Sequence, residues 1–77
     1  MITIYGSPNC RFCTLAKDLA DRTNISYNYI DVTKHEPSQD MFRARGFKTV
    51  PQIFDNDTYI GGYQEFVKAV NKEHTIT

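Results

Sequence analysis

The chain has 77 residues, of which 40% are apolar and 13% aromatic, so we expect one domain with one modest core. Nine Lys and Arg residues balance nine Asp and Glu residues, which argues against nucleic acid or a lipid surface as the main partner. No apolar run approaches the roughly 20 residues of a membrane-spanning helix, and residues 1–10 contain no secretory signal. The composition therefore predicts a cytoplasmic protein.

The first half of the chain predicts a strand, a helix and a second strand. Residues 2–5 are β-branched and alternate, as in a strand, and residues 6–9 interrupt them. Residues 25–32 are rich in β-branched and aromatic types and predict the second strand. Between them, apolar residues recur at helical spacing and predict a buried stripe formed by Phe12, Leu15, Ala16, Leu19 and Ala20.

The second half predicts a helix, a hairpin and a final helix. Pro37 suits the first turn of a helix and Gly46 suits its C-terminal cap. Residues 51–54 and 58–60 predict two strands joined by a tight turn. Gly61 and Gly62 interrupt the chain, and an apolar face follows at Phe66, Val67 and Val70.

The predicted order is strand, helix, strand, helix, strand, strand, helix. The first strand–helix–strand unit should be a right-handed crossover between parallel strands, whereas the hairpin is antiparallel. This order predicts an α/β fold with a four-stranded mixed sheet flanked by three helices.

Cys10 and Cys13 lie where the first strand meets the first helix. Residues three apart on a helix have Cβ atoms about 5–6 Å apart, close enough to form a disulfide after a small adjustment. Cys10 would lie at the helix N-terminus beside Arg11, where the dipole and the positive charge favour a thiolate. The pattern predicts that Cys10 attacks a target disulfide and that Cys13 resolves the mixed disulfide.

Two other interpretations of the cysteine pair stay open. A purely structural disulfide would close a very short loop and add only about 2 kcal/mol in the chain-entropy model. A structural zinc site needs four ligands, and only His35 and His74 remain as soft candidates beside the cysteines. We therefore expect no metal site.

The chain resembles the glutaredoxins, which have the thioredoxin fold. The resemblance covers nearly all of residues 1–77 and rests on Cys10 to Cys13, Thr49-Val50-Pro51, and Gly61-Gly62 in that order. It implies a cis Val50–Pro51 bond that faces the cysteines. It also implies a glutathione and substrate site formed by Arg11, Phe12, Lys48, Thr49, Val50, Pro51, Gly62, Tyr63 and Gln64. In that site, the helix N-terminus at residues 63–65 would offer N–H groups to a glutathione carboxylate.

The resemblance implies a monomeric dithiol oxidoreductase without a tightly bound cofactor, which uses glutathione as co-substrate. Its targets would be protein disulfides and glutathione mixed disulfides, and ribonucleotide reductase is the target that the family suggests. Two alternatives stay open. One is a glutaredoxin-like redoxin that thioredoxin reductase reduces. The other is a [2Fe–2S] cluster carrier, since the proline of the commonest family motif is replaced by Arg11.

Overall fold

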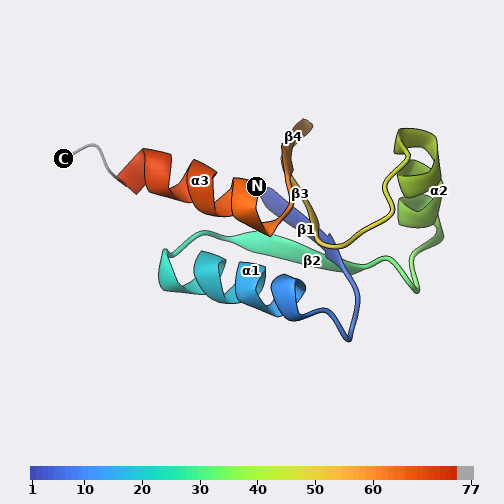
Figure 1. Cartoon of the computed structure of the whole chain (residues 1–77), viewed down its shortest axis with the longest axis horizontal. Coiled ribbons are helices and arrows are strands. Elements are labelled where there is room, and N and C mark those ends of the chain that lie inside the picture. The colour runs from blue at the N-terminus through green and yellow to red at the C-terminus, as the bar shows by residue number, and fades with distance from the viewer. Residues whose placement is uncertain (75–77) are drawn as a thin grey trace.

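The computed structural model describes residues 1–74, which form one four-stranded sheet and three helices (Figure 1). The elements follow the predicted order. They are β1 (Ile2–Gly6), α1 (Arg11–Arg22), β2 (Tyr27–Asp31), α2 (Glu36–Arg45), β3 (Gln52–Asp55), β4 (Thr58–Gly61) and α3 (Tyr63–His74). No helix in this part of the chain is both long enough and apolar enough to cross a membrane.

The sheet is mixed, as predicted, with the strand order β2-β1-β3-β4. Strand β1 pairs in parallel with β2 and antiparallel with β3, and β3 pairs antiparallel with β4. A parallel pair requires a long connection, which α1 supplies. The end of β1 and the start of α1 therefore meet at one edge of the molecule, and both cysteines lie there.

Helices α1 and α3 cover one face of the sheet (Figure 1). Their apolar stripes meet the inward-facing residues of β1 and β3, because alternate residues of a strand point to the same face. The buried core on this face consists of Ile4, Ala16, Ala20, Ile53, Phe66 and Val70.

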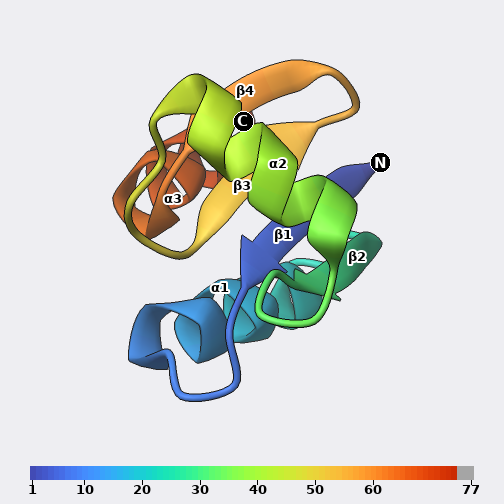
Figure 2. The ribbon, with the colours of Figure 1, turned by 90° about the vertical axis from the view of Figure 1, so that its right-hand side faces the viewer.

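Helix α2 lies against the opposite face, and Figure 2 shows it in front of β1 and β3. It packs there through rings that meet mostly edge to face, including Tyr5 with Phe42 and Phe42 with Phe47. We call this group the aromatic cluster. Its members are Tyr5, Phe42, Phe47, Phe54 and Tyr59.

The ends of α2 explain why so short a helix forms. The Nδ1 atom of His35 accepts a hydrogen bond from the backbone N–H of Ser38 at the N-terminus, and Pro37 lies in the first turn, as predicted. Gly46 has a φ of 72°, a left-handed conformation that glycine adopts without steric cost. The predicted C-terminal cap at Gly46 is confirmed.

Two predictions on the first half need correction. Phe12 does not belong to the buried stripe of α1, because its side chain is 51% exposed; the stripe begins with Cys13. The second strand is also shorter than residues 25–32. The N–H of Ile25 bonds to the carbonyl of Ala20 at the end of α1, so this residue closes the helix instead of joining the sheet.

Candidate active site

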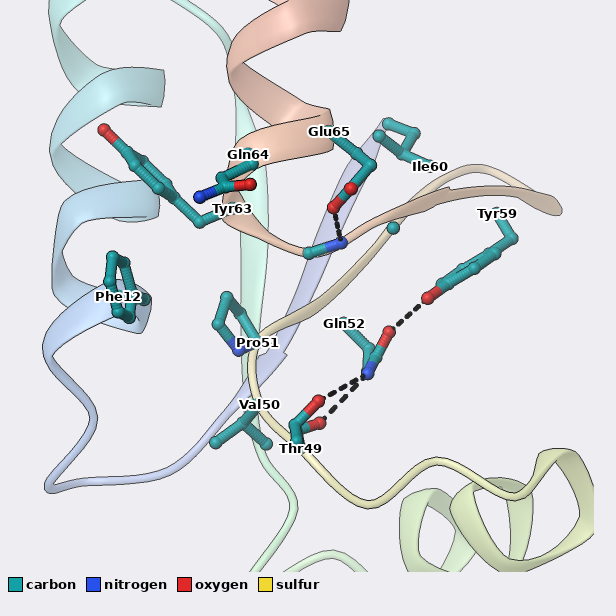
Figure 3. A pocket seen from close by; sticks show the side chains of 12 residues that line it. Phe12, Thr49, Val50, Pro51, Gln52, Tyr59, Ile60, Tyr63, Gln64 and Glu65 are labelled. Carbon is teal, nitrogen blue, oxygen red and sulfur yellow. Dashed lines mark hydrogen bonds between the residues drawn. The ribbon is translucent and has the colours of Figure 1, made fainter.

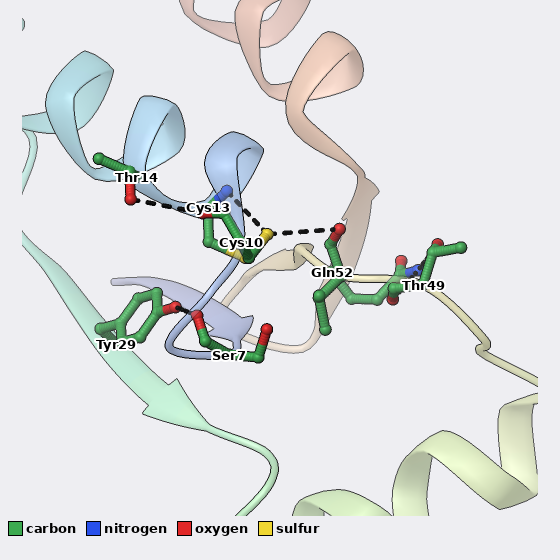
Figure 4. The surroundings of a disulfide bond; sticks show 8 residues. Ser7, Cys10, Cys13, Thr14, Tyr29, Thr49 and Gln52 are labelled. Carbon is green, nitrogen blue, oxygen red and sulfur yellow. Dashed lines mark hydrogen bonds between the residues drawn. A yellow bond between two sulfur atoms is a disulfide. The ribbon is translucent and has the colours of Figure 1, made fainter.

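Cys10 and Cys13 form a disulfide at the N-terminus of α1, with their Cα atoms 5.2 Å apart (Figure 4). Cys10 is the N-cap residue of the helix, and Cys13 lies in its first turn. The connection from β1 leaves the sheet at Gly6 and delivers Cys10 to this end of the helix. The structure therefore joins the two cysteines in the way that their spacing predicts.

The two sulfur atoms have different surroundings. The Sγ of Cys10 accepts a hydrogen bond from the backbone N–H of Cys13 over 3.0 Å. This N–H belongs to the positive end of the helix dipole, so it stabilises negative charge on Cys10 once the disulfide is reduced. Cys10 is half-buried, whereas Cys13 is only 1% exposed. A partner from solvent can thus reach Cys10 first.

The loop before β3 faces the disulfide. The Val50–Pro51 bond is cis, which confirms the prediction. The carbonyl oxygen of Val50 lies 3.7 Å from the Sγ of Cys10. The N–H and the carbonyl oxygen of Val50 are backbone groups that an extended peptide can pair with, as in the addition of a strand to a sheet.

Gln52 holds this loop in place, a role that the sequence did not indicate. Its side chain is 6% exposed, and its Nε2 donates to the carbonyl oxygen of Thr49 over 3.1 Å and to the Thr49 hydroxyl over 3.3 Å. The Tyr59 hydroxyl donates to the Oε1 of Gln52 (Figure 3). The polar atoms of a buried side chain need partners, and the residues around Val50 supply them here.

A groove of about 540 Å³ runs from the first turn of α1 past this loop to the start of α3. At one end, the rings of Phe12 and Tyr63 lie with their centroids 5.8 Å apart (Figure 3). The exposed Phe12 therefore faces the groove instead of the core. The predicted site residues that line the groove are Phe12, Thr49, Val50, Pro51, Gly62, Tyr63 and Gln64.

The residues that line the groove differ from the predicted site residues in two ways. Arg11 and Lys48 are exposed and lie outside the lining of the groove, each next in the chain to a residue that lines it. Five lining residues were absent from the predicted set: Gln52, Tyr59, Ile60, Gly61 and Glu65. Most of them are in the hairpin, where the alternation of a strand indicates a face of the sheet but does not indicate a groove.

The N-terminus of α3 already holds a carboxylate of the chain itself. The Oε1 of Glu65 accepts a hydrogen bond from the N–H of Gly62 over 2.9 Å (Figure 3). This is the geometry in which a side chain in the first turn reaches back to cap its own helix. The N–H groups expected to receive a ligand carboxylate thus have Glu65 beside them. An incoming anion would have to share this position with it or displace it.

The side chains that the structure describes contain no group of three or more His, Cys, Asp or Glu that could hold a metal ion. His35, one of the two soft zinc candidates, caps α2. The side chain of His74 lies outside the described residues.

Comparison with known proteins agrees with this geometry. The sequence model of the glutaredoxin family, described as "Glutaredoxin", matches residues 2–60. Glutaredoxin 1 of Escherichia coli (strain K12) is 34% identical over 90% of this chain and 91% of its own length. The structure of reduced Escherichia coli glutaredoxin superposes with a TM-score of 0.78 at 31% identity, covering 95% of each chain.

A second type of solved structure fits equally well. The glutaredoxin-like protein NrdH-redoxin from Escherichia coli, described as having a thioredoxin-like activity profile, superposes with a TM-score of 0.79. It covers 99% of this chain and 97% of its own, at 24% identity. This likeness concerns the fold alone, so the fold does not distinguish the two kinds of protein.

Proposed function

We propose that this chain, which belongs to the glutaredoxin family of thiol–disulfide oxidoreductases, takes electrons from glutathione. It would pass them to protein disulfides and to glutathione mixed disulfides. The observation that carries the proposal is the groove beside Cys10. The half-buried sulfur of Cys10 lies 3.7 Å from the carbonyl oxygen of Val50, and the groove that Val50 lines continues to the N-terminus of α3. These groups suit a short peptide thiol with a terminal carboxylate.

The first half of the cycle reduces the target. The thiolate of Cys10 attacks one sulfur of the target disulfide and forms a mixed disulfide, and the other target sulfur leaves as a thiolate and takes up a proton. Cys13 then loses its proton and attacks the sulfur of Cys10. The Cys10–Cys13 disulfide forms, and the second target thiol leaves. The target has gained two electrons and two protons.

The second half restores the dithiol. A glutathione thiolate attacks Cys10, the more exposed sulfur, and releases Cys13 as a thiol. A second glutathione attacks the sulfur of the bound glutathione. Glutathione disulfide leaves, and Cys10 leaves as the thiolate that its hydrogen bond from the N–H of Cys13 stabilises. Two glutathione molecules are thus oxidised for each target disulfide reduced.

The proposal extends to the setting of the reaction. The cycle requires a compartment that keeps glutathione reduced, which the cytoplasm does. Ribonucleotide reductase, which must recover a dithiol after each turnover, is the target class that the family suggests. We propose that the chain acts on it as a monomer.

A comparison of reductants tests the proposal. The oxidised protein is given either glutathione with glutathione reductase or thioredoxin reductase alone, both with NADPH. We expect rapid reduction of the Cys10–Cys13 disulfide only with glutathione. Preferential reduction by thioredoxin reductase would overturn the proposal and would identify a redoxin of the second type.

Two cysteine variants provide matched controls for the cycle. Cys13→Ser should keep activity towards glutathione mixed disulfides, because glutathione itself can resolve the glutathionylated Cys10. It should lose most activity towards protein disulfides, which need Cys13. Cys10→Ser should abolish both activities. An equal loss of both activities in the two variants would contradict the assigned roles.

A further inference from the structure

Tyr29 reaches the active site from β2, outside the groove. Its hydroxyl donates a hydrogen bond to the carbonyl oxygen of Ser7 over 3.0 Å (Figure 4). Ser7 lies in the connection that leaves β1 and leads to Cys10 three residues later. A hydrogen bond between residues 22 positions apart thus attaches the cysteine-bearing connection to the sheet.

Gly6 provides the room for this contact. A Cβ atom placed on Gly6 would lie 2.8 Å from the Sγ of Cys13 and closer still to the hydroxyl oxygen of Tyr29. Both distances are too short for nonbonded atoms. The buried sulfur of Cys13 and the hydroxyl of Tyr29 therefore lie against the same point of the β1 backbone, and only glycine leaves space for both.

The ring of Tyr29 also contacts a lysine of α1. The Nζ of Lys17, on α1, lies 4.2 Å from the ring centroid, within the range of a cation–π contact. Burial raises the pKa of the Tyr29 hydroxyl above its usual value, and the charge of Asp31 acts in the same direction. The hydroxyl thus remains a protonated donor over the whole range in which the thiols react.

We propose that Tyr29 is a positioning residue for the redox pair. Its hydroxyl holds the Ser7 carbonyl, and with it the connection that carries Cys10, in the position where Cys10 and Cys13 are joined. The hydrogen bond is present in the disulfide form, and the proposal is that it is weaker in the dithiol form, because only a difference between the two forms shifts their equilibrium. Tyr29 would thus adjust how readily the disulfide is reduced, without touching the substrate.

The experiment measures the equilibrium between the disulfide and the dithiol in Tyr29→Phe. The phenylalanine ring keeps its place beside Gly6 and under Lys17, and only the hydroxyl is lost. The protein is equilibrated with a series of ratios of reduced to oxidised glutathione and quenched in acid, and the disulfide fraction is counted by mass. In this exchange, two glutathione thiols give two electrons and two protons to the protein disulfide and leave as glutathione disulfide.

The chain offers a matched control in Tyr27→Phe. Tyr27 lies two residues away on the same strand and therefore on the same face, and its hydroxyl lies near Asp21 instead of the active-site connection. The same atom is removed in both variants. An equilibrium constant depends only on its end states, so the result does not depend on whether glutathione is the natural reductant.

We expect the equilibrium constant of Tyr29→Phe to move about 3- to 10-fold towards the dithiol, the effect of losing one net hydrogen bond. Tyr27→Phe should stay within twofold of the wild type. Three results would each overturn the proposal. They are a constant for Tyr29→Phe within twofold of the wild type, a shift towards the disulfide, and an equal shift in both variants. A purely structural role of the Tyr29 hydroxyl would lower the thermal stability of Tyr29→Phe without moving its equilibrium constant.

Discussion

The two faces of the sheet are built from different kinds of side chain. The buried core under α1 and α3 is aliphatic apart from Phe66, and its six residues are at most 5% exposed. The face under α2 consists of the aromatic cluster, where rings meet mostly edge to face and Tyr59 is 44% exposed. The core of the first face is therefore closed to water, whereas the second face is a partly wet layer between a helix and the sheet.

Each face supports a different part of the active site. On the aliphatic face, Cys13 belongs to the buried stripe of α1, and its side chain is buried in the first turn of that helix. On the aromatic face, two hydrogen bonds connect the cluster to the loop around Val50. Tyr59 donates to Gln52, and Gln52 donates to Thr49. The tightly packed face thus fixes the sulfur atoms, and the looser face holds the backbone that would meet a substrate.

The largest expected change in stability comes from removing one phenylalanine from each face. Phe66 is 1% exposed in the aliphatic core, so Phe66→Ala should lower the free energy of unfolding by about 3–5 kcal/mol. Phe42 is half-buried in the aromatic cluster, so Phe42→Ala should cost about 1–2 kcal/mol. Urea unfolding of both variants measures the difference. Equal losses would show that the two faces are equally well packed.

A smaller effect should come from the polar link between the aromatic cluster and the loop. Tyr59→Phe removes the hydrogen bond to the buried Oε1 of Gln52, which should lower the free energy of unfolding by about 0.5–1.5 kcal/mol. Tyr5→Phe, in the same cluster, is the control and should change it by less than about 0.5 kcal/mol. If both variants unfold at the same urea concentration, the Tyr59 hydroxyl does not support the loop.

The smallest expected effect on the free energy of unfolding comes from Asp31, where the chain leaves β2 for α2. The hydrogen bond from the Thr33 hydroxyl lowers the pKa of the Asp31 carboxyl, and the Thr33 N–H and the Lys34 charge act in the same direction. The resulting stability is present above the unfolded pKa of about 3.9 and is lost as the pH falls through the lower, folded pKa.

Thr33→Val tests this dependence because it removes the first of these causes. The wild type should be more stable than Thr33→Val at pH 6, and the difference should shrink as the pH falls to 3. Urea unfolding at several pH values measures it. A difference that stays constant between pH 6 and pH 3 would contradict the role of the Asp31 carboxylate.

The sequence predicts the order of the elements and the cysteine pair well, because both depend on neighbours along the chain. Apolar spacing reveals the helices, and Gly46 reveals the end of α2. Helical spacing placed Phe12 in the buried stripe, because spacing cannot show that the first turn extends past the sheet, where the ring meets Tyr63. The family resemblance placed Phe12 in the site, where it lines the groove. Family resemblance was needed for the cis bond at Pro51.

Other parts of the site depend on contacts that spacing does not encode. Gln52 reads as an ordinary strand residue, and its bonds to Thr49 and Tyr59 exist only after the hairpin has formed. Glu65 was predicted only to offer its backbone N–H to a ligand, and the sequence did not indicate that its side chain accepts a hydrogen bond from Gly62. The hydroxyl of Tyr29 meets the cysteine connection only because β1 and β2 are neighbours in the sheet.

The exposed position of Phe12 gives the molecule a useful optical property. The chain has no Trp and five Tyr, so its native fluorescence is weak and comes from tyrosine alone. A tryptophan in place of Phe12 would be the single strong fluorophore. Because this side chain is 51% exposed, the larger ring can be placed there without disturbing the core. Its emission, beside Tyr63 and the disulfide, would report in real time on both the occupancy of the groove and the state of the sulfur atoms.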